Sequence, residues 1–156
     1  MIRKIKKEDI PVCAEILCAV YNNELWQCRW ELETACAYLE DYFGGNKFVG
    51  FALEEDGRIL GALFAHEVIC WNNSELHIDE MFVQPDLQRK GYGSMLIKAA
   101  EEYIHARKLA GFTLSTNKYA PAPDFYRKNG FVDCPPVLFM YKVIDTNENT
   151  EKEQEI

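Results

Sequence analysis

The chain has 156 residues and a net charge of −8, from 17 basic and 25 acidic side chains. A chain of this length forms one domain with a sizeable core. The acidic excess argues against a nucleic-acid partner, whose contact surface would have to be basic. No stretch approaches the roughly 18 consecutive apolar residues of a membrane span, and Glu8 and Asp9 end the basic start before any apolar run. We therefore predict a cytoplasmic protein without a targeting segment or a membrane partner.

The six cysteines are interpreted as buried, reduced thiols because they lie in apolar patterns. They form no C-x-x-C pair and no His–Cys cluster with the spacing of metal ligands. We expect neither disulfides nor a metal. The positions are 13, 18, 28, 36, 70 and 134.

The first half of the chain alternates helical and strand patterns. An alternating stretch predicts an edge strand at 2–6. Acidic residues and Pro11 at 8–11 indicate the start of a first helix. A second helix is predicted over about 30–42 and is ended by Gly44 and Gly45. The turn at 55–57 joins two predicted hairpin strands, 47–54 and 58–69, and a third strand covers 75–83.

The second half begins with an amphipathic helix over 91–107 whose inward positions are Leu96, Ile97, Ala100 and Ile104. A strand at 112–115, a short helix at 121–129, and final strands at 131–132 and 137–143 follow. The order β-α-α-β-β-β-α-β-α-β-β predicts an α/β (mixed α+β) fold, a mixed sheet with helices on both faces. We expect one domain over 1–144 and a polar, disordered tail over 145–156.

The strongest local signal is the loop between the third strand and the long helix. Glycines let the backbone approach an anion closely, and the amino end of a helix presents unpaired N–H groups. Arg89 and Lys90 add positive charge. By itself the pattern is equally compatible with a tight turn carrying solvated basic residues. The loop reads Gln88-Arg89-Lys90-Gly91-Tyr92-Gly93-Ser94.

Two motifs resemble those of the GCN5-related N-acetyltransferase (GNAT) superfamily. Residues 83–93 match the pattern V-x-P-x-x-[QR]-x-x-G-x-[GA], and Asn117, Ala122 and residues 125–131 match N…A…F-Y-x-[KR]-x-G-F. The resemblance implies a mostly antiparallel central sheet and acetyl-coenzyme A as co-substrate. It also implies pyrophosphate contacts along 88–94, strand-like pairing of the pantetheine arm with Met81, Phe82 and Val83, and a pantetheine or thiol contact at Asn117.

Acetyl transfer to an amine requires a base for the amine and an acid for the departing thiolate. Tyr126 corresponds to a tyrosine that often serves the family as general acid, and packing in the core is its structural alternative. Asp79 aligns with an acidic residue of several branches and ranks first as base, followed by Glu80 and His77. Glu80 interrupts the apolar alternation, so either it points into a polar cavity or a bulge redirects it. The family often deprotonates the amine through water, without a single essential base.

The segment 21–30 is rich in aromatic and polar residues, which suit an organic cation. Glu24, Trp26, Trp30 and His77 are therefore candidates for acceptor binding, and a loop that only caps the sheet is an equal alternative.

We predict an acetyl-CoA-dependent N-acetyltransferase that works by direct attack in a ternary complex on a small cationic amine, such as an aminoglycoside or a polyamine. A protein N-terminal or lysine acetyltransferase and a non-catalytic acyl-CoA sensor are the alternatives. Dimerisation is common in the family, and the sequence leaves it open, together with the acceptor's identity.

Overall fold

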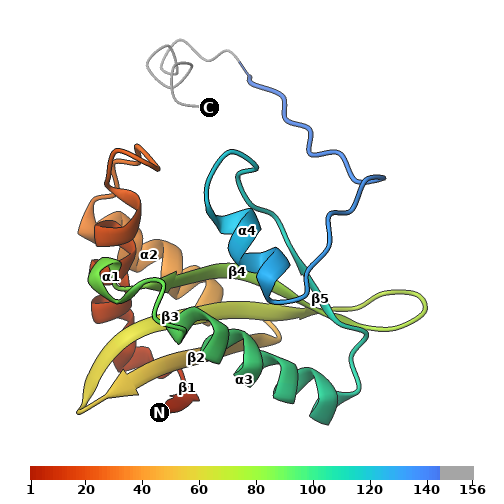
Figure 1. Cartoon of the computed structure of the whole chain (residues 1–156), viewed down its shortest axis with the longest axis horizontal. Coiled ribbons are helices and arrows are strands. Elements are labelled where there is room, and N and C mark those ends of the chain that lie inside the picture. Colours follow the sequence, from red (N-terminus) through yellow and green to blue (C-terminus); the bar gives the residue numbers. More distant parts are fainter. Residues whose placement is uncertain (145–156) are drawn as a thin grey trace.

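The computed structural model of the chain describes residues 1–144 (Figure 1). Five strands and four α-helices follow one another, with two short 3-10 turns between them. In chain order the elements are β1 (Ile2–Lys4), η1 (Lys7–Asp9), α1 (Ile10–Tyr21), α2 (Leu32–Phe43), β2 (Phe48–Glu55), β3 (Arg58–Val68), β4 (Glu75–Val83), η2 (Pro85–Leu87), α3 (Tyr92–Arg107), β5 (Phe112–Leu114) and α4 (Ala122–Lys128).

The strands form one sheet in the order β1-β2-β3-β4-β5. The first three pairings are antiparallel, and only β4 and β5 run parallel. In Figure 1, α1 and α2 lie on one face of the sheet, α3 lies on the other, and α4 lies over its β4–β5 end. This is the mixed, mostly antiparallel sheet flanked by helices that the sequence predicts.

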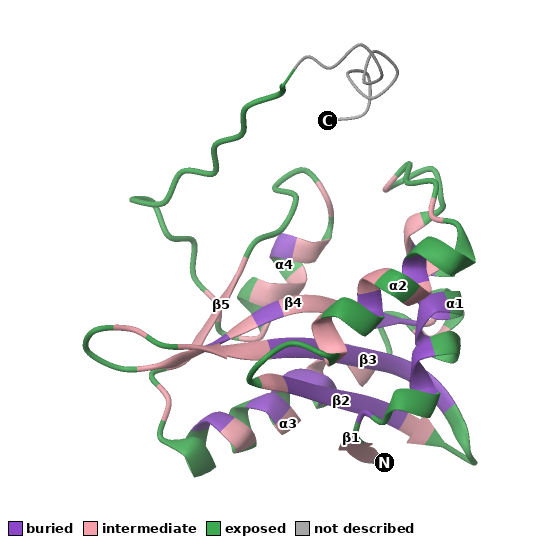
Figure 2. Cartoon of the chain, turned by 180° about the vertical axis from the view of Figure 1, so that it is seen from behind, coloured by how far each residue is buried: buried purple, intermediate pink, exposed green. Residues whose placement is uncertain are grey.

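Two apolar clusters hold these layers together, one on each face. The first joins α1 and α2 to the sheet through side chains such as Leu17, Leu39 and Phe64. The second joins α3 to the opposite face, and the predicted inward residues Leu96, Ile97, Ala100 and Ile104 are all buried there. Figure 2 shows that the buried residues are concentrated along β2 and β3. The centre of the sheet is therefore covered on both sides, which leaves its two outer strands to interact with other groups.

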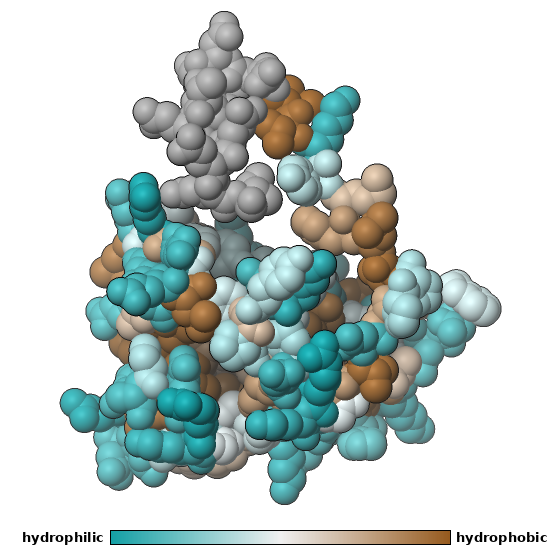
Figure 3. Space-filling model, turned by 45° about the horizontal axis from the view of Figure 1, so that its top comes forward, coloured by the Kyte–Doolittle hydropathy of each residue, from teal (hydrophilic) through white to brown (hydrophobic). Residues whose placement is uncertain are grey.

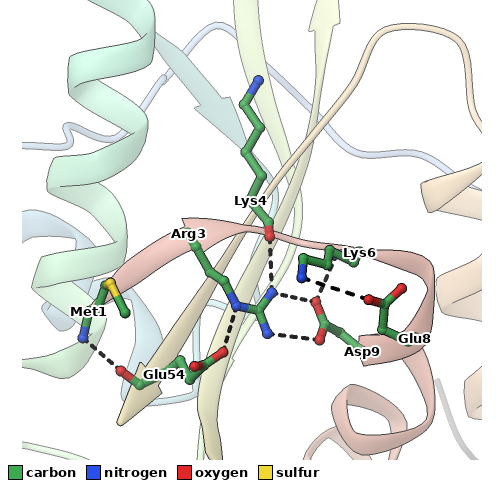
Figure 4. Close-up of polar contacts among 7 residues, drawn as sticks. All are labelled: Met1, Arg3, Lys4, Lys6, Glu8, Asp9 and Glu54. Carbon is green, nitrogen blue, oxygen red and sulfur yellow. Dashed lines mark hydrogen bonds and ion pairs between the residues drawn. The ribbon is translucent and has the colours of Figure 1, made fainter. Parts of the chain in front are cut away.

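Charged contacts fasten the amino-terminal strand to the rest of the molecule (Figure 4). Arg3 donates two hydrogen bonds to the buried carboxylate of Asp9, at 2.7 and 2.9 Å, and a further one to Glu54. The hydrogen bonds from Arg3 hold the pKa of Asp9 below its ordinary value. This ion pair ties the start of α1 to β1 and to the end of β2.

The carboxyl-terminal part differs from the prediction. No strand is present within 131–144, where final strands were expected at 131–132 and 137–143. That stretch is extended but has no neighbouring strand with which to pair, and a strand needs such a partner. The tail expected over 145–156 lies outside the described residues.

The prediction of buried thiols is correct for Cys13 but wrong for Cys28 and Cys134, which are exposed. The remaining three, Cys18, Cys36 and Cys70, are half-buried. Within residues 1–144, no helix combines the length and the apolar character that crossing a membrane requires.

Candidate acetyl-transfer site

The two parallel strands of the sheet separate halfway along β4. β5 pairs with β4 at three positions, the last being Ile78 opposite Leu114. β4 continues for five further residues, Asp79 to Val83, while its pairing with β3 extends to the end. Along this stretch the edge of β4 that faces away from β3 has no partner strand among the described residues. Backbone groups there are available to an extended ligand in the manner of an added strand.

The three residues predicted to contact the pantetheine arm lie in this stretch. Their side chains belong to the core: Phe82 packs on the face of α1 and α2, whereas Met81 and Val83 pack on the face of α3. The backbone groups of this edge of β4 remain without a partner strand among the described residues, and the contact with a pantetheine arm stays a prediction.

The loop between β4 and α3 contains the positive backbone φ angles that its glycines suggest. Gly91 has a φ of +89° and directly precedes the helix, and Arg89 also has a positive φ, +61°. The Gln88 side chain donates a hydrogen bond of 3.2 Å to the carbonyl oxygen of Val83, which links the loop to the end of β4. The side chains of Arg89 and Lys90 are exposed. This conformation brings the loop back over the splayed strand end.

The amino end of α3 presents free N–H groups. Its first hydrogen bond runs from the Met95 N–H to the Gly91 carbonyl oxygen, at 3.1 Å. The helix itself offers no acceptor to the N–H groups of Tyr92, Gly93 and Ser94, and the helix dipole places partial positive charge there. Gly93 packs closely against the Phe125 ring, since a Cβ atom would lie 3.0 Å from it and would require the ring to shift. The residues present thus fit a pyrophosphate held by backbone groups.

A β-bulge in β4 decides which acidic residue enters the site. Ile78 is opposite Ala65 and Glu80 is opposite Phe64, so that Asp79 is an extra residue with no partner of its own on β3. Residues on a regular strand alternate between faces, and one extra residue reverses the alternation. Leu76 and Ile78 accordingly face α3, whereas Phe82 faces α1 and α2. Without the bulge, Glu80 would lie on the face of α3.

The two neighbouring carboxylates have different surroundings. Asp79 is hydrogen-bonded to Nδ1 of His66 at 2.7 Å, and its side chain is only 7% exposed. Glu80 is half-buried, and this loss of solvent raises its pKa to about 7, while the Tyr21 hydroxyl opposes the rise and the charge of Asp79 adds to it. Glu80 thus changes its protonation state near neutral pH, as a general base should.

Tyrosines from three different helices surround Glu80. Tyr21 ends α1, Tyr38 lies in the middle of α2, and Tyr126 lies in α4. Burial raises the pKa of all three hydroxyls, and the carboxylate of Glu80 raises each of them further, that of Tyr126 to about 12. All three are therefore protonated at neutral pH and can donate hydrogen bonds.

Tyr126 lies between the carboxylate and the core. Its ring contacts those of Phe125 and Phe131 at 5.2 and 5.3 Å, so its ring position is fixed. Phe125, interpreted as a core aromatic, packs within this cluster and against Gly93. The ring of Tyr126 is packed, and its hydroxyl is close enough to Glu80 to be affected by its charge, whereas its role as general acid stays a prediction.

Two other predicted residues are engaged in local contacts. The side-chain oxygen of Asn117 accepts a hydrogen bond from the Tyr119 N–H at 2.9 Å, which shapes the exposed loop before α4. The ring of His77 is 2.9 Å from the Thr113 hydroxyl, which in turn donates to Glu75 at 3.0 Å. His77 thus links β4 to β5 on the carboxylate-bearing face, at a position where the two strands are still paired.

The aromatic residues of the loop between α1 and α2 support the tyrosine cluster. The Trp26 ring contacts that of Tyr21 at 5.1 Å, and the Trp30 ring contacts that of Tyr38 at 4.9 Å. Glu24 is exposed on the same loop and lines a shallow depression with Asn22, Asn23 and Gln27. Trp26 and Trp30 thus contact the tyrosines that neighbour Glu80, whereas Glu24 lies at the exposed edge of the loop.

Sequence reasoning missed the roles of Tyr21, Tyr38 and His66. The helical register could have placed Tyr21 and Tyr38 on the inner faces of their helices, but no local pattern connects them to Glu80. His66 was given no role because its partner, Asp79, lies 13 residues away on the next strand.

Comparison with known proteins supports this interpretation of the fold. A model of the acetyltransferase (GNAT) domain matches residues 46–133, which cover β2 to α4. This is more than half of the chain, and the protein belongs to the GNAT acetyltransferase family. Comparison with curated protein sequences found no match.

Solved structures share the fold at low sequence identity. An aminoglycoside acetyltransferase from an uncultured soil metagenomic sample, crystallised with sisomicin, is similar with a TM-score of 0.72 and 19% identity, over 93% of this chain and 96% of that chain. A possible acetyltransferase from Clostridium difficile 630 has a TM-score of 0.77 and 16% identity, over 93% and 98%. A transcriptional regulator from Bacillus halodurans C-125 has a TM-score of 0.73 and 19% identity, over 91% and 99%.

Proposed function

We propose that the protein is an acetyl-CoA-dependent N-acetyltransferase that transfers the acetyl group directly to a primary amine of a small cation. The observation that carries the proposal is the position of Glu80, a half-buried carboxylate beside the splay between β4 and β5, where loss of solvent raises its pKa to about 7. The family supplies the acetyl-transfer chemistry.

Acetyl-CoA would bind with its pyrophosphate on the N–H groups at the start of α3 and its pantetheine along Asp79 to Val83. The first contact relies on the helix terminus and on the loop that Gly91 opens. The second places the thioester in the notch where β5 leaves β4. No side chain needs to react with the acetyl group, so a covalent enzyme intermediate is not required. The described residues contain no group of three or more His, Cys, Asp or Glu side chains suited to a metal ion.

The acceptor would bind as a cation between Glu80 and the tyrosine rings. An alkylammonium with a pKa of about 10 must lose a proton before it can attack. Glu80 takes this proton, directly or through water, and the amine nitrogen then forms a bond to the thioester carbon. As the C–S bond breaks, Tyr126 donates a proton to the thiolate. The amide nitrogen releases its second proton to solvent, and Tyr126 regains a proton from solvent. Asp79, ranked first from the sequence, serves here as the partner of His66, and Glu80 takes its place as base.

The test is a panel of acceptors with purified full-length protein and acetyl-CoA, read as release of free thiol. Spermidine and an aminoglycoside represent small polycations, a monoamine and a lysine-containing peptide represent the alternatives, and a neutral alcohol is the control. We expect the polycations to react with the highest kcat/KM. A preference for the peptide would contradict the acceptor class. Binding of CoA without turnover of any amine would contradict catalysis and support a sensor.

A further inference from the structure

Two histidines form a pair across neighbouring strands of the sheet. His66 of β3 is directly opposite His77 of β4, and the centres of their rings are 5.5 Å apart. Both side chains are half-buried. Their neighbours Ala65 and Ile78 pack on the face of α3, so both imidazoles lie on the other face of the sheet. The pairing of the two strands therefore holds the two rings side by side.

The hydrogen bonds of each ring show which nitrogen carries the proton. Nδ1 of His66 is 2.7 Å from a carboxylate oxygen of Asp79, and Nδ1 is the donor because a carboxylate only accepts. Nδ1 of His77 is 2.9 Å from the Thr113 hydroxyl, which donates its single proton to Glu75 at 3.0 Å. The hydroxyl therefore accepts its other hydrogen bond from His77. In the neutral form both rings carry the proton on Nδ1, and Nε2 keeps its lone pair.

Both Nε2 atoms are open to solvent. Neither has a hydrogen-bond partner among residues 1–144, and no buried side-chain nitrogen or oxygen in that part of the chain lacks a partner, so neither Nε2 atom is buried. Histidines that bind a metal ion through one nitrogen donate from the other to a fixed acceptor, as these two do. Zn–N bonds of about 2.1 Å at a tetrahedral angle place two ring centres about 5 Å apart, close to the separation of this pair.

The charge around the pair favours a cation. The strand that carries His77 also carries three carboxylates, Glu75, Asp79 and Glu80, and the whole chain has a net charge of −8. Figure 3 shows that hydrophilic side chains cover most of the body on the face that it displays. A negatively charged surface raises the local concentration of cations.

We propose that His66 and His77 bind a divalent transition metal ion of the zinc class through their two Nε2 atoms, with water in the remaining positions. Imidazole is a ligand for zinc, copper and nickel, whereas magnesium and calcium prefer oxygen. Two protein ligands are fewer than the three of a catalytic zinc site, so we expect an ion that exchanges. A dication on the face that carries Glu80 would repel a cationic acceptor. This inhibition rests on the proposed function, whereas the binding does not.

The test is nitrogen NMR of the three histidine rings in labelled full-length protein at about pH 8, where imidazoles are neutral, without acetyl-CoA. Before metal is added, His66 and His77 should both carry the proton on Nδ1. Zn²⁺ alone should then shift Nε2 of these two rings and leave His105, which is exposed near the end of α3, unchanged. Protons on Nε2 of both rings would overturn the proposal, as would Zn²⁺ binding that shifts neither ring.

Zn²⁺ titrations of variants, followed at the His66 ring, measure what each group contributes. His77→Gln should weaken binding by about 100-fold or more, because one of two protein ligands is lost, and Thr113→Val by about tenfold, because the acceptor that orients the ring is lost. His105→Gln is the matched control and should bind as the wild type does. Equal binding by His77→Gln and the wild type would overturn the proposal. None of these measurements requires turnover, so the metal site fails or stands separately from the acetyl-transfer assignment.

Discussion

The two halves of the proposed site are built in different ways. On the cofactor side, backbone groups of the loop and of the first turn of α3 form the binding surface, and they come from one continuous stretch of chain. On the acceptor side, Glu80 and three tyrosines meet from β4 and from three helices that are far apart in the sequence. A surface made of backbone leaves a trace in the sequence as glycines at fixed spacing. A surface made of distant side chains leaves none.

The largest expected effect is at Glu80. We predict that Glu80→Gln lowers kcat by about 100-fold or more, because the variant keeps the shape of the side chain but cannot take a proton. With the wild type, kcat/KM should rise with pH and level off above about 7, where Glu80 is ionised. The variant should lose that rise while it binds CoA as before. Asp79→Asn is the comparison, and an equal or larger loss there would restore Asp79 as the base.

The same substitution should stabilise the protein at alkaline pH. Burial raises the pKa of Glu80 from its ordinary 4.5 to about 7, so the folded state binds the proton more tightly than the unfolded chain. The contribution of Glu80 to stability is therefore greatest below about pH 4.5, falls as the pH rises to about 7, and is constant above that. The full difference corresponds to about 3 kcal/mol, and Glu80→Gln should recover up to that amount at pH 8.

Denaturant unfolding of wild type and Glu80→Gln at pH 5 and pH 8 measures this effect. The gain should be larger at pH 8, and a gain that does not change with pH would show that Glu80 is not strained by its burial. A stable variant without activity would place Glu80 among the residues that serve function at a cost in stability.

Tyr126→Phe tests the acceptor side of the site at a second step, the protonation of the departing thiolate. We predict that kcat falls by about tenfold, since only a hydroxyl hydrogen bond is removed, and that the dissociation constant for CoA does not change. Tyr42→Phe is the matched control, because its hydroxyl contacts only that of Tyr38, at 3.4 Å, among the contacts described. Equal effects of Tyr126→Phe and Tyr42→Phe on kcat would show that Tyr126 is a packed core aromatic and not the general acid.

The cofactor side should respond to the backbone more than to charge. Gly91→Ala places a Cβ at a φ of +89°, a strained position that costs about 1 kcal/mol, and we expect CoA binding to weaken by about fivefold as the loop relaxes. Lys90→Ala should weaken it by only about twofold, and the effect should vanish in high salt. Calorimetric titration with CoA measures both. A greater loss in Lys90→Ala would show that side-chain charge dominates the site.

The smallest effect concerns the partner of Asp79. His66→Gln removes the ring that is hydrogen-bonded to Asp79, and the carboxylate without this partner should raise the pKa of its neighbour Glu80 slightly. The midpoint of the kcat/KM profile should move to higher pH, with little change in its plateau. A fall in the plateau without a shift would indicate a structural role for His66.

Most of the fold could be predicted because its signals are local. The apolar spacing of α3 and the turns around β2, β3 and β4 predict these elements to within one or two residues. The strand predicted at 137–143 from its apolar sequence is absent, because a strand also requires a neighbouring strand, and a local pattern does not show whether one is present. At the site, the loop at 88–94 was found from its glycines.

The acceptor side could be predicted only in part. The break in apolar alternation at Glu80 correctly suggested a bulge or a polar cavity. It could not reveal that Asp79, rather than Glu80, is the extra residue, since this depends on the register of β4 against β3. The tyrosines around Glu80 come together only when the helices are packed on the sheet.

The bulge in β4 also means that the face on which the Glu80 carboxylate lies depends on whether β3 and β4 pair residue for residue before it. One residue inserted into β3 opposite Asp79 would pair the two strands regularly and leave the sequence of β4 unaltered, yet it would turn Glu80 toward α3. Scanning by substitution tests what each side chain contributes and cannot detect this dependence. Scanning by single-residue insertion can.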